Sequence, residues 1–154
     1  MSKKTPKQQI PWNKGKPYND LGKERFSIGQ KHLFSWIRDK GFSDLVARDF
    51  AVANLCLKSG LNKPAIILYA GVLEALLGYV LKREDLVFAD LIDQSFTQNF
   101  ISESNKNKLR VLRDFRNYVH LLLESKGEFE LTIGISQLAK ETCESVIKGL
   151  KDKF

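Results

Sequence analysis

The chain has 154 residues, of which 43% are hydrophobic and 28% charged, and its formal net charge is +7. This length suits a single domain with its own core, which needs neither disulfides nor a structural metal. Cys56 and Cys143 have no CxxC or Cys/His spacing, so the sequence predicts no disulfide framework and no zinc site. Neither a membrane span nor a secretory signal is apparent, and we expect a cytosolic, soluble protein.

Most of the positive charge lies at the start of the chain. Residues 1–25 hold seven Lys/Arg against two acids, a net charge of +5, whereas the rest of the chain carries only +2. Three of the four prolines also lie there, with few aliphatic residues to offset the entropy of ordering the segment. We therefore predict a disordered basic tail over residues 1–25 and a helical domain over residues 26–154.

The tail has two interpretations. Its segment PWNKGKP, Pro11 to Pro17, resembles a short basic repeat that lies beside homing-endonuclease domains and helps to grip DNA. The tail is then an arm whose lysines bind phosphates in a salt-dependent way: Lys3, Lys4, Lys7, Lys14 and Lys16. Alternatively it is a solvated segment without a ligand.

From Ser27 onward the apolar pattern is helical. A first helix that ends at Gly41 is indicated by Leu33, Phe34, Ile37 and Phe42. Ser43 is the expected N-cap of a second helix, which runs to a stop at Gly60. The apolar residues that indicate the second helix are Leu45, Val46, Phe50, Val52, Ala53 and Leu57.

The second half of the chain predicts four more helices. Asn62 as a cap and Pro64 in the first turn open a third helix, apolar on nearly every side and therefore central, which ends near Lys82 and Arg83. The remaining helices are expected at about 88–98, at about 102–124 and at about 134–151, with an extended pattern at 129–133. The series predicts an all-α fold, an antiparallel bundle of about five to six helices.

The helix expected at about 102–124 has an apolar and a polar side. At about 100° per residue, the side that we expect in the core carries Leu112, Phe115, Val119 and Leu122. The opposite side carries Lys106, Arg110, Arg113, Arg116, Asn117, His120 and Glu124. The spacing predicts that Arg113, Arg116 and His120 point the same way and reach one ligand.

This polar side suits phosphodiester chemistry on RNA. The pKa of a histidine suits it to transfer a proton near neutral pH, and one arginine can donate two parallel hydrogen bonds to two phosphate oxygens. His120 would take or give the proton, while Arg113 or Arg116 stabilises the negative transition state. No cluster of histidines and carboxylates has metal-ligand spacing, so we expect neither a metal nor another cofactor.

The segment LRDFRNYVH, residues 112–120, resembles the HEPN superfamily of small all-α domains, whose hallmark is an Arg, a polar residue and a His after four to six intervening positions. Arg113, Asp114 and His120 meet this pattern with six residues between Arg and His. Arg116 and Asn117 give the commoner Arg-Asn start of the motif, but only three residues then lie between Arg116 and His120. Which of the two arginines is the key motif arginine therefore stays open. AIILYAGVLEALLGYVLKRE and LVFADLIDQSF also look like family helices, and the resemblance covers roughly residues 45–150.

The resemblance implies a homodimer with the motif helices face to face. Many such domains are metal-independent endoribonucleases in toxin–antitoxin or phage-defence systems, and this implies RNA as substrate and an antitoxin or defence protein as partner. The alternative is a non-catalytic module that uses the same side to bind nucleotides or RNA, or to dock a protein. A third interpretation is a structural bundle in which the tail alone contacts nucleic acid.

Glu74 is the single charge in the apolar stretch from Ala65 to Leu81. A carboxylate buried there needs a partner, because an uncompensated buried charge costs several kcal/mol. We predict that Glu74 is buried and pairs with Arg113, Arg116 or His120. It either fixes the register of two helices or orients a catalytic Arg or His.

Overall fold

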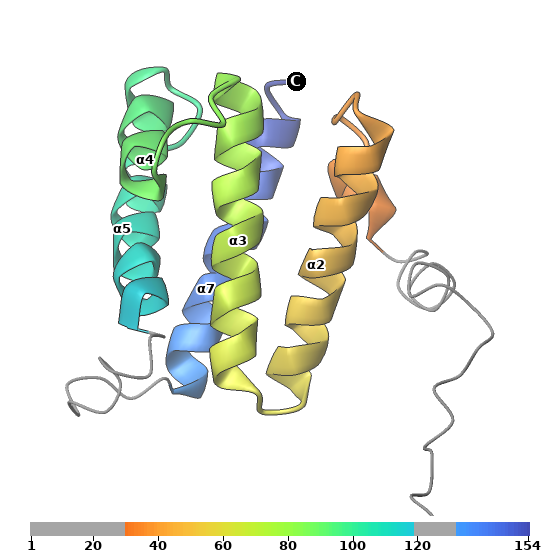
Figure 1. Ribbon diagram of the computed structural model, residues 1–154, viewed down its shortest axis with the longest axis vertical. Helices are drawn as coiled ribbons and strands as arrows, with labels where there is room; N and C mark the ends of the chain where they lie inside the picture. Colours follow the sequence, from red (N-terminus) through yellow and green to blue (C-terminus); the bar gives the residue numbers. More distant parts are fainter. Residues whose placement is uncertain (1–29, 119–131) are drawn as a thin grey trace, which may run out of the picture.

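The computed structural model describes residues 30–118 and 132–154, and within these ranges it contains helices and no strand. A 3₁₀ turn precedes five α-helices: η1 Lys31–Phe34, α2 Lys40–Lys58, α3 Asn62–Leu81, α4 Phe88–Thr97, α5 Glu103–Tyr118 and α7 Ile133–Lys151. The long helices α2, α3, α5 and α7 alternate in direction along the bundle (Figure 1). The predicted all-α antiparallel bundle is confirmed, whereas the predicted tail lies outside the described residues.

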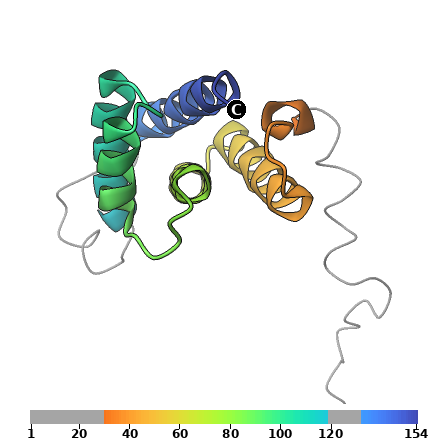
Figure 2. The same cartoon turned by 90° about the horizontal axis from the view of Figure 1, so that it is seen from above.

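Helix α3 lies at the centre, as its composition predicts. It contacts α2, α4, α5 and α7, which surround it on three sides (Figure 2). Nine of its 20 residues are buried. By length and composition α3 is the one described helix that could span a membrane, and half of its apolar stretch is buried inside the bundle. On its fourth side Ile67 is exposed, and Gly71 and Glu74 are partly exposed.

The start of α2 differs from the prediction. Among the described residues before it, from residue 30 on, a single 3₁₀ turn forms, and α2 begins at Lys40, so Gly41 lies inside its first turn rather than at the end of another helix. Asp39 is the N-cap, and its carboxylate accepts a hydrogen bond of 2.9 Å from the Phe42 amide. Ser43, the predicted cap, instead donates its hydroxyl proton to the Phe34 carbonyl at 3.1 Å, which ties α2 to η1.

The buried side of α2 carries Val46, Ala47, Phe50 and Ala53. Phe50 packs edge-on against Phe34 and against Tyr69 of α3, each at 5.9 Å between ring centroids. Of the apolar residues that indicate this helix in the sequence, Leu45 is 46% exposed, and Val52 and Leu57 are half-buried. The α2 surface therefore has more apolar residues than one buried side accommodates.

The helix ends around the α2–α3 turn are close to the predicted ones. Helix α2 ends at Lys58, and Gly60 adopts a left-handed φ of 72°, which glycine tolerates without a side-chain clash. Helix α3 begins at Asn62 with Pro64 in its first turn, where the missing amide proton costs nothing. It ends at a left-handed Lys82, where the Arg83 amide returns to the Gly78 carbonyl at 3.0 Å.

The later helices agree with the prediction within a residue or two at the ends that are described. Ser102 caps α5 by accepting a hydrogen bond of 3.2 Å from the Asn105 amide. Residues 119–131, where the prediction continues this helix to Glu124, lie outside the described residues. Most of the extended pattern at 129–133 lies there too, and Ile133 is the first residue of α7.

Candidate functional site

The orientation of α5 decides which motif side chains reach other helices. Its buried residues are Asn105, Leu109 and Leu112, spaced i, i+4 and i+7. Arg116 comes four residues later and continues the same stripe. The predicted stripe shares only Leu112 with this one and lies roughly 70° away around the helix. Phe115 is half-buried, and the predicted core residues Val119 and Leu122 lie outside the described residues.

Arg116 points toward α3 and α4. One guanidinium nitrogen, Nη2, lies 2.8 Å from Oε2 of Glu74, and the guanidinium carbon lies 5.9 Å from the centre of the Phe88 ring. The predicted ion pair between Glu74 and a motif arginine is therefore confirmed. The predicted burial of Glu74 is wrong, because its side chain is 28% exposed on the uncovered side of α3. Arg116 lies on the inner side of α5 rather than on the predicted outer one.

Arg113 has different surroundings. Its side chain is 35% exposed, and its Nη2 and Nε donate hydrogen bonds to Oδ1 of Asp114 at 2.7 and 3.1 Å. Asn117 follows one turn later on the same side and is exposed. Arg113 and Arg116 thus have separate acidic partners, and only Arg113 shares its side of the helix with Asn117.

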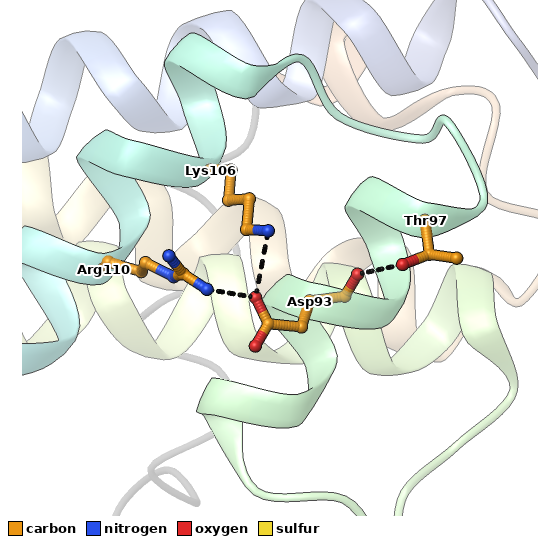
Figure 3. Close-up of polar contacts among 4 residues, drawn as sticks. All are labelled: Asp93, Thr97, Lys106 and Arg110. Atoms are coloured by element: carbon orange, nitrogen blue, oxygen red, sulfur yellow. Dashed lines mark hydrogen bonds and ion pairs between the residues drawn. The ribbon is translucent and has the colours of Figure 1, made fainter.

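Two other bases of α5 bind α4. Asp93 Oδ1 lies 2.7 Å from Nη2 of Arg110 and 3.4 Å from Nζ of Lys106 (Figure 3). Lys106 also sits 4.3 Å above the centre of the Phe96 ring, and the Thr97 hydroxyl donates to the Asp93 carbonyl at 2.9 Å. Lys106 and Arg110 therefore clamp α5 to α4 instead of lying free on an outer polar side.

The Asp93 carboxylate reflects this clamp in its protonation. Partial desolvation raises the pKa of Asp93, but the hydrogen bonds and charges of Arg110 and Lys106 outweigh it and lower the pKa below the usual 3.8. Asp93 and Phe88 contact the motif helix although no sequence motif indicated them. The available signal was that α4, which carries acidic residues, comes just before the basic helix α5 in the chain. Residue spacing within α5, however, does not reveal which residues of α4 its side chains contact.

The remaining predicted site residues lie outside the described residues. They are His120 and Glu124 after α5, and the tail lysines Lys3, Lys4, Lys7, Lys14 and Lys16. Within residues 30–118 and 132–154, no three His, Cys, Asp or Glu side chains come close enough together to hold a metal ion. Both motif arginines are partly exposed, and Arg113 is the one whose acidic partner lies on its own helix, one turn before the exposed Asn117.

Comparisons with known protein families, curated proteins and solved structures give no match for this chain. The resemblance to HEPN domains therefore rests on the residues of the motif and its neighbouring segments, beside an all-α bundle that suits them. An all-α bundle hosts many functions, so the fold by itself does not select one.

Proposed function

We propose that this protein is a metal-independent endoribonuclease of the HEPN type, which acts in the cytoplasm as a homodimer alongside an antitoxin or phage-defence partner. The observation that carries the proposal is the separation of the two motif arginines. The two side chains are about equally exposed, 38% for Arg116 and 35% for Arg113, but Arg116 pairs with Glu74 of another helix and lies near Phe88, whereas Arg113 pairs with its own neighbour, Asp114. Arg113 with Asp114 and His120 is also the set that meets the family spacing.

The proposed chemistry uses these residues in distinct roles. The Arg113 guanidinium donates two hydrogen bonds to the phosphate oxygens and replaces its contact with Asp114 by a contact with RNA. His120 takes the proton from the 2′-hydroxyl, whose oxygen attacks phosphorus and displaces the 5′-oxygen, or it protonates that leaving oxygen. The products are a 2′,3′-cyclic phosphate and a free 5′-hydroxyl. Arg116 positions the helix through Glu74 and does not touch the phosphate.

The test is RNA cleavage by the purified full chain in the presence of a chelator. We expect wild type to cut single-stranded RNA and to leave the same RNA intact when its 2′-hydroxyls are methylated, because the nucleophile is then blocked. His120→Ala should lower the cleavage rate by about 10²- to 10⁴-fold, the usual contribution of a general acid or base. If wild type is as inert as His120→Ala across a range of RNAs, the proposal of an enzyme fails.

A second candidate function is a non-catalytic module that binds RNA or nucleotides, or docks a partner protein. It is favoured by the acidic partners of both motif arginines, at 2.7 Å for Arg113 and 2.8 Å for Arg116, which offset part of their charge. This candidate predicts that His120→Ala binds RNA as tightly as wild type and that neither protein cleaves it. Binding that drops with salt and with loss of the tail lysines would place the contact in residues 1–25.

A further inference from the structure

Helix α2 carries an apolar stripe on the side that faces away from the core. Leu45 and Leu55 are 46% and 50% exposed, and Val52 between them is half-buried. In chain order, Leu45, Arg48, Val52 and Leu55 follow the spacing i, i+3, i+7 and i+10. This is the spacing of the a and d positions, the contact seam of a coiled coil, over two heptads. At 1.5 Å per residue, the stripe is about 15 Å long. Exposed leucines in a seam of this kind are typical of a helix that packs against another helix.

Arg48 does not interrupt this seam with a free charge. Its Nη2 and Nε lie 2.8 and 2.9 Å from Oδ1 of Asp49, so the guanidinium is turned to one flank. The aliphatic part of the side chain can then cover apolar surface, as long basic side chains commonly do. The seam thus presents two leucines, a valine and an arginine stem.

The charges on the other flank match a second copy of α2 that runs in the opposite direction. This flank carries Asp44, Ala51 and Lys58, each seven residues apart, and both charged residues are exposed. In an antiparallel pair with Leu45 opposite Leu55, Asp44 lies opposite Lys58 at both ends and the small Ala51 faces its own copy near the two-fold axis. A parallel pair would instead place Asp44 opposite Asp49 twice, whereas the antiparallel pair brings only the two Asp49 carboxylates together near the axis, each of them already paired with Arg48.

We propose that α2 is the contact surface for a second copy of this chain, in an antiparallel two-fold pair. The outer side of α5 is less suited to this role, because its exposed residues are mostly polar or charged and include a single large apolar one, Val111. Helices α2 and α5 lie on opposite sides of the bundle (Figure 1). Such a dimer differs from the face-to-face pairing of motif helices that the HEPN resemblance implies, because it keeps the two α5 helices apart.

This inference shares the homodimer with the proposed function but depends on no catalytic residue. Oligomeric state is measured without RNA, so a failure of the dimer and a failure of RNA cleavage are seen in separate experiments. The alternative occupants of the α2 stripe are residues 1–29 of the same chain and an unrelated protein, and both predict a monomer for the purified full chain.

Sedimentation velocity over a micromolar concentration series tests the surface. We expect wild type to dimerise and Leu45→Glu/Leu55→Glu to weaken dimerisation at least about 100-fold, since each copy loses two apolar anchors. Val111→Glu on α5 is the matched control and should dimerise like wild type. Circular dichroism of each variant checks that it is folded. A monomeric wild type, or a dimer that Val111→Glu breaks and the double variant keeps, overturns the proposal.

A charge reversal tests the direction of the pair. Asp44→Lys places two lysines opposite each other at both ends and should weaken dimerisation roughly 5- to 10-fold. Adding Lys58→Asp restores the opposite charges and should restore the dimer. If Asp44→Lys has no effect on dimerisation, or Lys58→Asp fails to restore it, the antiparallel register is wrong.

A cysteine at the axis gives a direct geometric test. In a Cys56→Ala background, Ala51→Cys should form a disulfide-linked dimer on mild oxidation, because the two copies of residue 51 face each other. Ser59→Cys in the same background should not, since the two copies of residue 59 lie about 27 Å apart along the pair. Cross-linking through residue 59 and not through residue 51 would overturn the antiparallel arrangement.

Discussion

Helices α3 and α5 lie side by side in the bundle, but different forces hold them. Helix α3 buries nine residues among four neighbouring helices, and after Lys63 in its first turn it carries a single charge, Glu74. Helix α5 buries only Asn105, Leu109 and Leu112, and its neighbours supply acids to three of its bases: Asp93 for Lys106 and Arg110, and Glu74 for Arg116. Apolar burial thus places α3, whereas a short apolar stripe and interhelical ion pairs together orient α5.

The largest expected effect concerns the stripe of α5 that faces the core of the bundle. Leu112 is fully buried, whereas the adjacent Val111 is 42% exposed. Leu112→Ala should lower the free energy of unfolding by about 2–5 kcal/mol, because it leaves a cavity, and Val111→Ala should change it by less than about 0.5 kcal/mol. Urea denaturation of both variants measures the difference. Equal losses would mean that α5 is oriented differently.

The ion pair between Arg116 and Glu74 should have a smaller effect. Both side chains are partly exposed, so solvent screens the pair, and we expect a coupling of about 0.5–1 kcal/mol in a double-mutant cycle. The variants are Glu74→Gln, Arg116→Gln and the combination, which keep the size of each side chain nearly unchanged. Losses that simply add up would indicate that the contact contributes no stability.

The clamp of α4 onto α5 predicts a pH dependence. The pKa of Asp93 is lower in the folded chain than its ordinary value of 3.8, so this carboxylate stabilises the fold above about pH 4 and the contribution is lost as the pH falls below that. Asp93→Asn should therefore lower the melting temperature at about pH 7 and have little effect near pH 2. Asp90→Asn, an exposed acid on the same helix, is the control. A loss for Asp93→Asn of the same size at both pH values would contradict the clamp.

The smallest effect on stability is expected from removing residues 1–25. The segment adds little apolar pattern to the fold, so the melting temperature should change by only a few degrees. Its net charge of +5 should nevertheless strengthen RNA binding at low salt, and the deletion should weaken binding and flatten its salt dependence. Collapse of the melting transition on deletion would show that this segment belongs to the fold.

Comparing α3 with α5 also explains which features the sequence could predict. Helix α3 is apolar on nearly every side, so its central place follows without knowledge of its neighbours, and Gly60 and Pro64 mark the turn before it. Because α3 is so apolar, its acid Glu74 was expected to need a cationic partner. The sequence could narrow the partner to a motif residue, but it could not choose between Arg113 and Arg116, since the choice depends on how α5 is rotated.

The rotation of α5 was not predictable from its apolar residues. Leu112 belongs to two apolar lines, one with Leu109 and one with Phe115, and the line through Leu109 is the one that packs inward. The line through Leu109 also directs Lys106 and Arg110 toward Asp93 on α4. The start of α2 could not be predicted for a similar reason, because Asp39 and Ser43 are both suitable N-cap residues. In the structure Asp39 caps the helix, and the Ser43 hydroxyl donates a hydrogen bond to the Phe34 carbonyl.

The central claim is that Arg113 meets the phosphate while Arg116 holds the helix, and RNA cleavage with chelator present tests it most directly when Arg113→Ala and Arg116→Ala are compared. We expect Arg113→Ala to lose at least about 100-fold in cleavage rate without a change in melting temperature. Arg116→Ala should melt at a lower temperature but cleave within about 10-fold of wild type while it is folded. Loss of cleavage in folded Arg116→Ala with activity kept in Arg113→Ala would contradict the account.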